Sequence, residues 1–181
     1  MIKLITILAV MLVCSGCRTA ISTGWQFSSA PGSSISLSAF ESWVKTNSVS
    51  GVMRLSCKEL NTVWVREYKD GSPHGETTAW LNSKLVSHES YRNGKLHGTS
   101  EDYYDNGNIC ERANYKDGVL NGDYSYWHIN GMLMSKGCYL DGEKNGEWLV
   151  LVADGCPYRL NVYVHGKLIS GAIGNKSTSK E

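Results

Sequence analysis

The 181-residue chain lacks an excess of charge of either sign. Its 18 Lys and Arg are balanced by 17 Asp and Glu, which gives a formal net charge of +1. Proteins that bind nucleic acid usually carry a basic excess or a basic stripe, whereas the cations here are scattered among acidic residues along the whole chain. The composition therefore argues against nucleic acid as a partner.

The spacings that mark common catalytic and metal sites are also missing. The sequence contains no HExxH, no GxSxG and no glycine-rich phosphate loop that opens a helix. His88, His128 and His165 have no spacing to carboxylates that would indicate a triad or a metal motif. We therefore expect no enzyme, with no catalytic residues, no metal and no cofactor.

The first residues have the features of an export signal. Lys3 precedes a short apolar run, Ile5 to Val13, which is too short to span a bilayer. The following Cys14-Ser15-Gly16-Cys17 resembles the lipobox of bacterial lipoproteins, which implies that residues 1–16 are removed and that Cys17 carries the lipid. The resemblance, with Arg18 after the cysteine, implies an exported protein of the cell envelope, anchored in the outer membrane and facing the periplasm. The alternative is cleavage nearby by another peptidase and release of a soluble protein.

Four further cysteines fall in the mature part. They are Cys57, Cys110, Cys138 and Cys156, and they show no CxxC spacing. An exported chain meets an oxidising compartment, so these cysteines are either buried thiols or members of one or two disulfides. Three pairings of four cysteines remain open.

One short unit recurs along the mature chain. A tyrosine is followed by glycines three and seven positions on, and successive tyrosines are 23, 24, 24 and 24 residues apart. The tyrosines are Tyr68, Tyr91, Tyr115, Tyr139 and Tyr163. The glycines are Gly71 and Gly75, Gly94 and Gly98, Gly118 and Gly122, Gly142 and Gly146, and Gly166, with Ser170 in the last second position.

Each unit carries two turn signals. Asp-Gly or Asn-Gly falls inside the motif, and a second such dipeptide follows at 106–107, 130–131 and 154–155. These dipeptides favour two-residue type I′ hairpin turns. The turns then pair Gly98 with Tyr115, Gly122 with Tyr139 and Gly146 with Tyr163, so that each ring has room over a glycine. A three-residue loop centred on Ser83 would pair Gly75 with Tyr91 in the same way.

The repeat predicts an all-β fold, a single-layer antiparallel meander of hairpins over residues 52–173. Residues 17–37 read as a flexible tether, 38–51 as a short helix or a degenerate cap, and 174–181 as a disordered tail. Ser38 and Glu41 form a capping-box pattern that favours a helix at 39–46 over a degenerate repeat ending at Gly51. The length predicts one domain.

The motif, with a second aromatic residue five positions on, resembles the MORN repeat variant. Bacterial proteins of this type are commonly grouped as the YwqK-family antitoxin group. The resemblance covers residues 60–171 and implies the meander fold. The antitoxin label would imply a cytosolic partner, which the export signal contradicts.

One row of side chains is a candidate binding surface. Trp80, Tyr103 and Trp127, followed by Leu151, stand five residues after the second glycines. The two-residue turns place Tyr103 opposite Cys110 and Trp127 opposite Met134, on the face away from the tyrosine row. The alternative is that this row packs on itself and twists the sheet. The tyrosines themselves are expected to be structural, and His74 and His97 to lie in solvated turns.

These observations favour a non-catalytic binding or scaffold lipoprotein that presents its sheet to a partner protein of unknown identity. Two alternatives stay open: a periplasmic immunity protein that neutralises a toxin, and a protein that binds glycan or peptidoglycan through the aromatic row.

Overall fold

The computed structural model describes residues 17–21, 37–57, 61–151 and 157–173. Contacts divide the chain into two compact units, Met1–Lys95 and Leu96–Glu181, where the sequence predicts one domain. In a meander each strand contacts only its neighbours, so few contacts between distant strands unite a long array. The proposed leader at 1–16 and tail at 174–181 lie outside the described residues.

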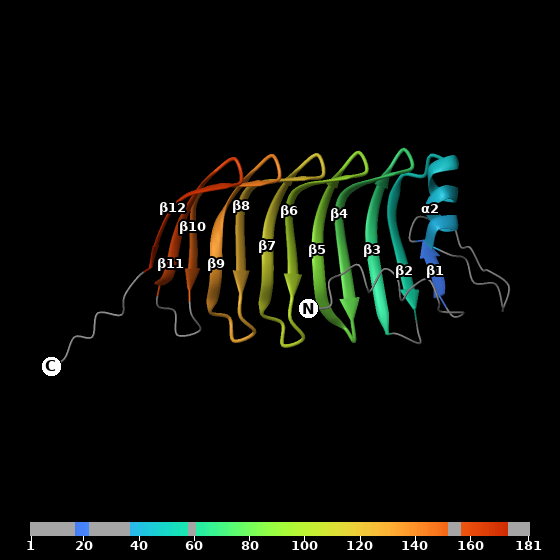
Figure 1. The fold of residues 1–181 in the computed structure, drawn as a ribbon. Helices are drawn as coiled ribbons and strands as arrows, with labels where there is room; N and C mark the ends of the chain where they lie inside the picture. Colours follow the sequence, from blue (N-terminus) through green and yellow to red (C-terminus); the bar gives the residue numbers. More distant parts are fainter. Residues whose placement is uncertain (1–16, 22–36, 58–60, 152–156, 174–181) are drawn as a thin grey trace. The chain divides into compact units, whose positions relative to one another are not determined.

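The first unit is an antiparallel meander with one helix (Figure 1). Its strands follow one another in chain order, as the sequence predicts, and the expected short helix is present. The elements are β1 (Cys17–Ile21), α2 (Leu37–Thr46), β2 (Gly51–Cys57), β3 (Thr62–Lys69), β4 (Ser72–Leu81) and β5 (Lys84–Arg92).

The second unit is also an antiparallel meander in chain order. Its strands are β6 (Lys95–Tyr103), β7 (Ile109–Lys116), β8 (Val119–Trp127), β9 (Leu133–Leu140), β10 (Glu143–Leu151), β11 (Pro157–Val164) and β12 (Lys167–Ile173). The predicted fold class, a meander of repeated hairpins, is confirmed.

Strand β1 was not expected. The sequence assigns residues 17–37 to a tether, but Cys17–Ile21 pair antiparallel with β2, from Cys17 opposite Cys57 to Ile21 opposite Met53. The outer side of β2 offers unpaired backbone groups, and pairing with any extended segment satisfies them. Residues 22–36 of the expected tether lie outside the described part of the chain.

The turns are of two kinds, whereas the sequence suggests one. At Asp70-Gly71, Asn93-Gly94, Asp117-Gly118, Asp141-Gly142 and His165-Gly166 both residues have positive φ, as type I′ requires. At Asn106-Gly107 and Asn130-Gly131 only the glycine does. There, Tyr104 N donates to Asn108 O and Gly107 N to Tyr104 O, which closes a three-residue loop. The prediction of a two-residue turn at these positions is wrong.

The longer loop changes the register at its base. Tyr103 pairs with Ile109 instead of Cys110, and Trp127 pairs with Leu133 instead of Met134, because a one-residue bulge precedes each loop. The turn at Ser83 also differs from the prediction, but it is shorter than predicted instead of longer. Asn82 and Ser83 both have positive φ and form a two-residue turn in place of the expected three-residue loop, and a bulge after Ala79 restores the register.

Beyond these bulges the predicted tyrosine–glycine register holds. Gly75 pairs with Tyr91, Gly98 with Tyr115, Gly122 with Tyr139 and Gly146 with Tyr163. Gly51 likewise pairs with Tyr68, so the upstream repeat keeps its second glycine although a helix replaces its first half.

The reason given for the second glycine is corrected. A Cβ on Gly122 would meet Asn114 Cβ at 3.2 Å, and one on Gly146 would meet nothing within 4 Å, so these glycines do not make room for a ring. They have positive φ, 110° and 75°. Each lies at a bulge, where a step of two residues on one strand corresponds to a step of four residues on its neighbour. Around Gly122, for example, Tyr115 pairs with Leu120, whereas Ala113, two residues away, pairs with Tyr124. A left-handed backbone at this bulge favours glycine.

The tyrosines define one side of each unit, which we call the tyrosine face, and we call the other side the reverse face. In the first unit α2 packs on the tyrosine face. Val44 is fully buried against Met53 and Tyr68. Gly71 lies under the helix end, where a Cβ would come within 2.8 Å of Lys45 Cα. Gly71 is therefore required by its φ of 75° and by the helix contact together.

Gly71→Ala is expected to destabilise the protein by about 2–4 kcal/mol. Left-handed backbone costs an alanine about 1–2 kcal/mol, and the clash with the Lys45 backbone adds to this because backbone atoms cannot rotate away. The free energy of unfolding from urea denaturation measures the effect.

Gly107→Ala is the matched control. Gly107 has a φ of 87°, but a Cβ there meets nothing within 4 Å, so we expect only about 1–2 kcal/mol. Equal losses in the two variants would contradict the helix contact.

Candidate binding site

The three predicted ring residues lie near strand ends. Trp80 stands near the end of β4 in the first unit, and Tyr103 and Trp127 end β6 and β8 in the second. Side chains alternate along a strand, and each ring stands five residues after a glycine that pairs with a tyrosine. The rings therefore lie on the reverse face of their units.

In the second unit these rings belong to a charged network. Arg112 Nε donates to Glu101 Oε1 at 2.7 Å, and the Tyr103 hydroxyl donates to Glu101 Oε2 at 2.5 Å. The Arg112 guanidinium lies 5.8 Å from the centre of the Trp127 ring. Glu101 and Arg112 lie directly opposite each other on β6 and β7. Opposite charges at facing positions stabilise neighbouring strands, and the predicted register already pairs these two residues, so this charge pair was predictable from the sequence.

This network raises the pKa of Tyr103 to about 12. The first cause is burial, and the second is the hydrogen bond to Glu101, which is lost when the hydroxyl ionises. Tyr103 therefore stays neutral at physiological pH and acts as a hydrogen-bond donor.

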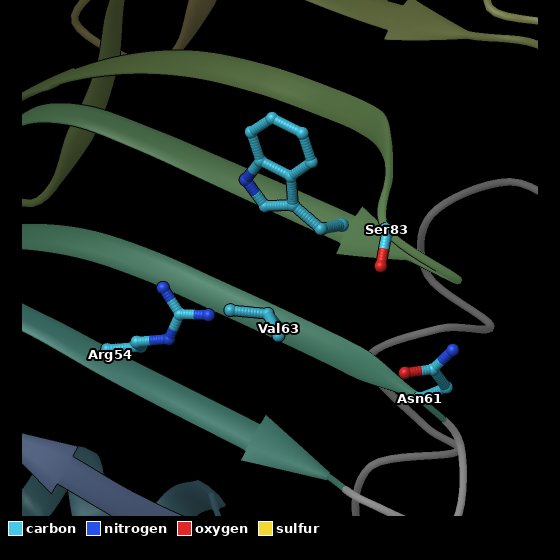
Figure 2. A pocket seen from close by; sticks show the side chains of 5 residues that line it. Arg54, Asn61, Val63 and Ser83 are labelled. Atoms are coloured by element: carbon cyan, nitrogen blue, oxygen red, sulfur yellow. The ribbon is translucent and has the colours of Figure 1, made fainter.

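Trp80 has a different environment. With Arg54, Asn61, Val63 and Ser83 it lines a hollow of about 320 Å³ on the first unit (Figure 2). Val63 pairs with Trp80 across β3 and β4. The indole Nε1 donates to Thr78 Oγ1 at 3.2 Å, which fixes the ring. Arg54 lies outside the repeat motif, and no spacing in the sequence indicates that it lines the same hollow as Trp80.

In the first unit the tyrosine face holds a buried cation. The Arg66 guanidinium lies 4.5 Å from the centre of the Trp64 ring and 5.0 Å from that of Tyr91. Its Nε donates to Thr77 Oγ1, and it forms an ion pair of 3.6 Å with Glu41 of α2. Burial raises the pKa of Tyr91. Arg66 thus links sheet and helix, a role that the sequence does not reveal.

In the second unit the tyrosine face packs on itself. Trp148 is 3% exposed, and its ring contacts Tyr124, Tyr139 and Tyr163 at centroid distances of 5.0–6.4 Å. A Cβ on Gly137 would overlap the Trp148 ring, so the expected packing of a ring over a glycine occurs here instead of in the motif.

Among the residues that the structure describes, no group of three His, Cys, Asp or Glu is placed to hold a metal ion. His97 Nδ1 accepts a hydrogen bond from Asp117 N, so it caps the turn of the next repeat, where solvation was expected. Cys110 and Cys138 are free thiols. The side chains of Cys57 and Cys156 lie outside the described set.

The geometry can be compared with known proteins at this point. Residues 96–117 match the family model described as MORN repeat variant. The matched stretch holds Gly98, Asn106-Gly107 and Tyr115, so one period of the repeat matches the MORN repeat variant. No significant match was found among curated proteins.

Two similar solved structures are of TarM. "Crystal Structure of TarM" is 14% identical with a TM-score of 0.34 and covers 60% of this chain and 22% of that chain. The second is an S. aureus TarM mutant in complex with Fondaparinux, alpha-GlcNAc-glycerol and UDP. It is 14% identical with a TM-score of 0.35, and the match covers 60% of this chain and 23% of that chain. The chain spans less than a quarter of TarM, and likeness at this level carries no argument about function. Within the described ranges, no helix has the length and apolar character needed to cross a bilayer.

The raised pKa of Tyr103 predicts a pH dependence of stability. The unfolded tyrosine ionises near pH 10 and the folded one near 12, so its contribution to stability is complete below pH 10 and is lost as the pH rises from 10 to 12. Tyr103→Phe should therefore lose stability less steeply than wild type in this window, as measured by urea denaturation at several pH values. Arg112→Gln keeps the phenol and removes the cation that lowers its pKa, so this variant should still lose stability more steeply than Tyr103→Phe. Parallel curves for wild type and Tyr103→Phe would contradict the assignment.

Proposed function

We propose that the chain is a non-catalytic binding scaffold of the bacterial cell envelope, anchored to the outer membrane through Cys17 and facing the periplasm. Its MORN-type repeats build a sheet to which a partner protein binds. The observation that carries the proposal is the last strand of the second unit, β12.

Strand β12 is an edge strand. It pairs with β11 on one side, and no strand of the described ranges pairs with its other side. Edge strands offer unpaired N–H and C=O groups to an incoming strand, and proteins usually protect them with charge or proline. Lys167–Ile173 contain no proline, and their one charged residue, Lys167, stands at the first position.

The side chains at this edge are apolar and exposed. Leu168 is 53% and Ile169 59% exposed, and on the neighbouring β11 Val164 is 48% and Leu160 37% exposed. Exposed apolar clusters of this kind mark interaction sites. The edge therefore favours an extended segment of a partner protein that adds a strand through its backbone and buries apolar side chains.

The docking edge is testable by photo-crosslinking in cells. Replacing Ile169 with p-benzoyl-phenylalanine should give one dominant adduct to a second protein, detected as a shifted band and identified by mass spectrometry. The same replacement at Val119, which is also apolar and 45% exposed but begins β8, a strand paired on both sides, is the control and should give no such adduct.

Adducts of equal strength at both positions, or none at 169, would argue against docking at β12. If the crosslinked protein is toxic when exported alone, the partner is a toxin and the scaffold is an immunity protein.

The anchor makes a separate prediction. Labelled palmitate should be incorporated by the wild-type chain and lost in Cys17→Ala, because the thiol of the last residue of the lipobox-like sequence is the acylated group. Cys57→Ala keeps the lipobox and should retain the label. Label that survives Cys17→Ala would refute the anchor.

A further inference from the structure

We propose that the hollow beside Trp80 binds a pyranose sugar that bears a carboxylate, such as a hexuronic acid. Its volume, about 320 Å³, lies at the lower end of the range for small-molecule sites. The hollow belongs to the first unit and β12 to the second, so this site is independent of the proposed protein-docking edge.

Trp80 supplies a flat apolar surface. The side chain is 37% exposed, an unusual state for a large ring, and the hydrogen bond from Nε1 to Thr78 Oγ1 holds it in one orientation. Val63, its cross-strand partner, extends the apolar surface. A pyranose presents a similarly flat face of C–H groups, and its burial against the indole removes apolar area from water.

Arg54 supplies the charge. It is exposed on β2 and pairs in register with Val65. Two arginines on other strands have carboxylate partners, Glu41 for Arg66 and Glu101 for Arg112, whereas Arg54 forms no ion pair with a described carboxylate. Figure 2 shows its guanidinium extended toward Val63, at the hollow. A guanidinium presents paired N–H donors that fit a carboxylate.

Asn61 and Ser83 supply neutral polar groups at the rim. Asn61 Nδ2 donates to Asn82 Oδ1 at 2.9 Å. This leaves the side-chain oxygen of Asn61, Oδ1, as an acceptor for a hydroxyl. Ser83 has a φ of 63° at the turn position that glycine occupies in the five type I′ turns of the motif. The chain thus keeps a strained residue there and with it a hydroxyl at the hollow.

These groups distinguish between ligand classes. A neutral sugar would leave the guanidinium unused, and a small carboxylate such as acetate would leave the ring uncovered. Only a ligand that has both a flat face and a carboxylate contacts Arg54 and Trp80 together. The ligand is therefore proposed to contact Arg54 and Trp80 at the same time.

Isothermal titration calorimetry of the mature chain in detergent micelles tests it with three probes: sodium glucuronate, glucose and sodium acetate. We expect saturable glucuronate binding with a Kd of about 1 mM or tighter, and binding of glucose and acetate at least about tenfold weaker. Absence of saturable glucuronate binding, or equal affinity for glucose or acetate, would overturn the proposal.

Three variants locate the site. Arg54→Gln should weaken glucuronate binding at least about tenfold, since a charge-assisted hydrogen bond is lost. Lys116→Gln removes an exposed cation from the other unit and should bind as wild type. Ser83→Gly should raise the Tm, because glycine relieves the left-handed strain, yet weaken binding. Unchanged affinity in Arg54→Gln, or in a stabilised Ser83→Gly, would contradict the assignment.

Discussion

The structure depends on left-handed backbone at the second residue of each type I′ turn. That residue is glycine in all five turns of the motif, and its N–H donates at 2.8–2.9 Å to a carbonyl one repeat earlier. The donors are Gly71, Gly94, Gly118, Gly142 and Gly166, and the acceptors are the carbonyls of Val49, Pro73, Leu96, Leu120 and Lys144. Each turn therefore satisfies a backbone group of the preceding repeat and sets the position of the next. The glycine of the motif is a requirement of stacking.

Side chains reinforce this ladder of turns. Ser50 Oγ accepts from Asp70 N, His97 Nδ1 from Asp117 N and Asn145 Oδ1 from His165 N. Each of these acceptors is the residue directly before a second glycine of the motif. Serine, histidine and asparagine can each supply an acceptor at this position. In another repeat Asn121 instead donates from Nδ2 to Asp141 Oδ1, so the position bonds to the next turn in more than one way. Its polar character therefore follows from stacking and carries little information about ligands.

The same compensation appears across the tyrosine face. Facing positions pair a large side chain with a small one, as in Arg66 with Thr77 and Ala113 with Tyr124, and Gly137 lies beneath the Trp148 ring. Close packing in a thin layer requires that the volumes of two facing side chains add up to about the same total at each position. Repeats can thus differ in sequence while the spacing between strands is kept.

The sequence predicted the features that depend on local periodicity. The tyrosine–glycine register followed from constant spacing, and the helix at Leu37–Thr46 followed from its capping pattern. The loop at Asn106 was mispredicted because the dipeptide does not fix the φ of its asparagine, which depends on hydrogen bonds that Tyr104 and Asn108 make after folding. Arg54 was missed at the candidate site for a related reason: it stands upstream of the motif, and only strand pairing brings it near Trp80.

The two candidate binding features, the hollow beside Trp80 and the edge strand β12, lie where the sequence departs from the repeat motif. Ser83 replaces a turn glycine at the hollow, and Ser170 replaces the second glycine in β12, where the register shift falls from two residues to one. A repeat that follows the rule uses its side chains to stack, and a repeat that departs from it has side chains and edges free for other contacts. In a protein whose motif is a folding device, the departures from the motif are therefore more informative about binding than the motif itself.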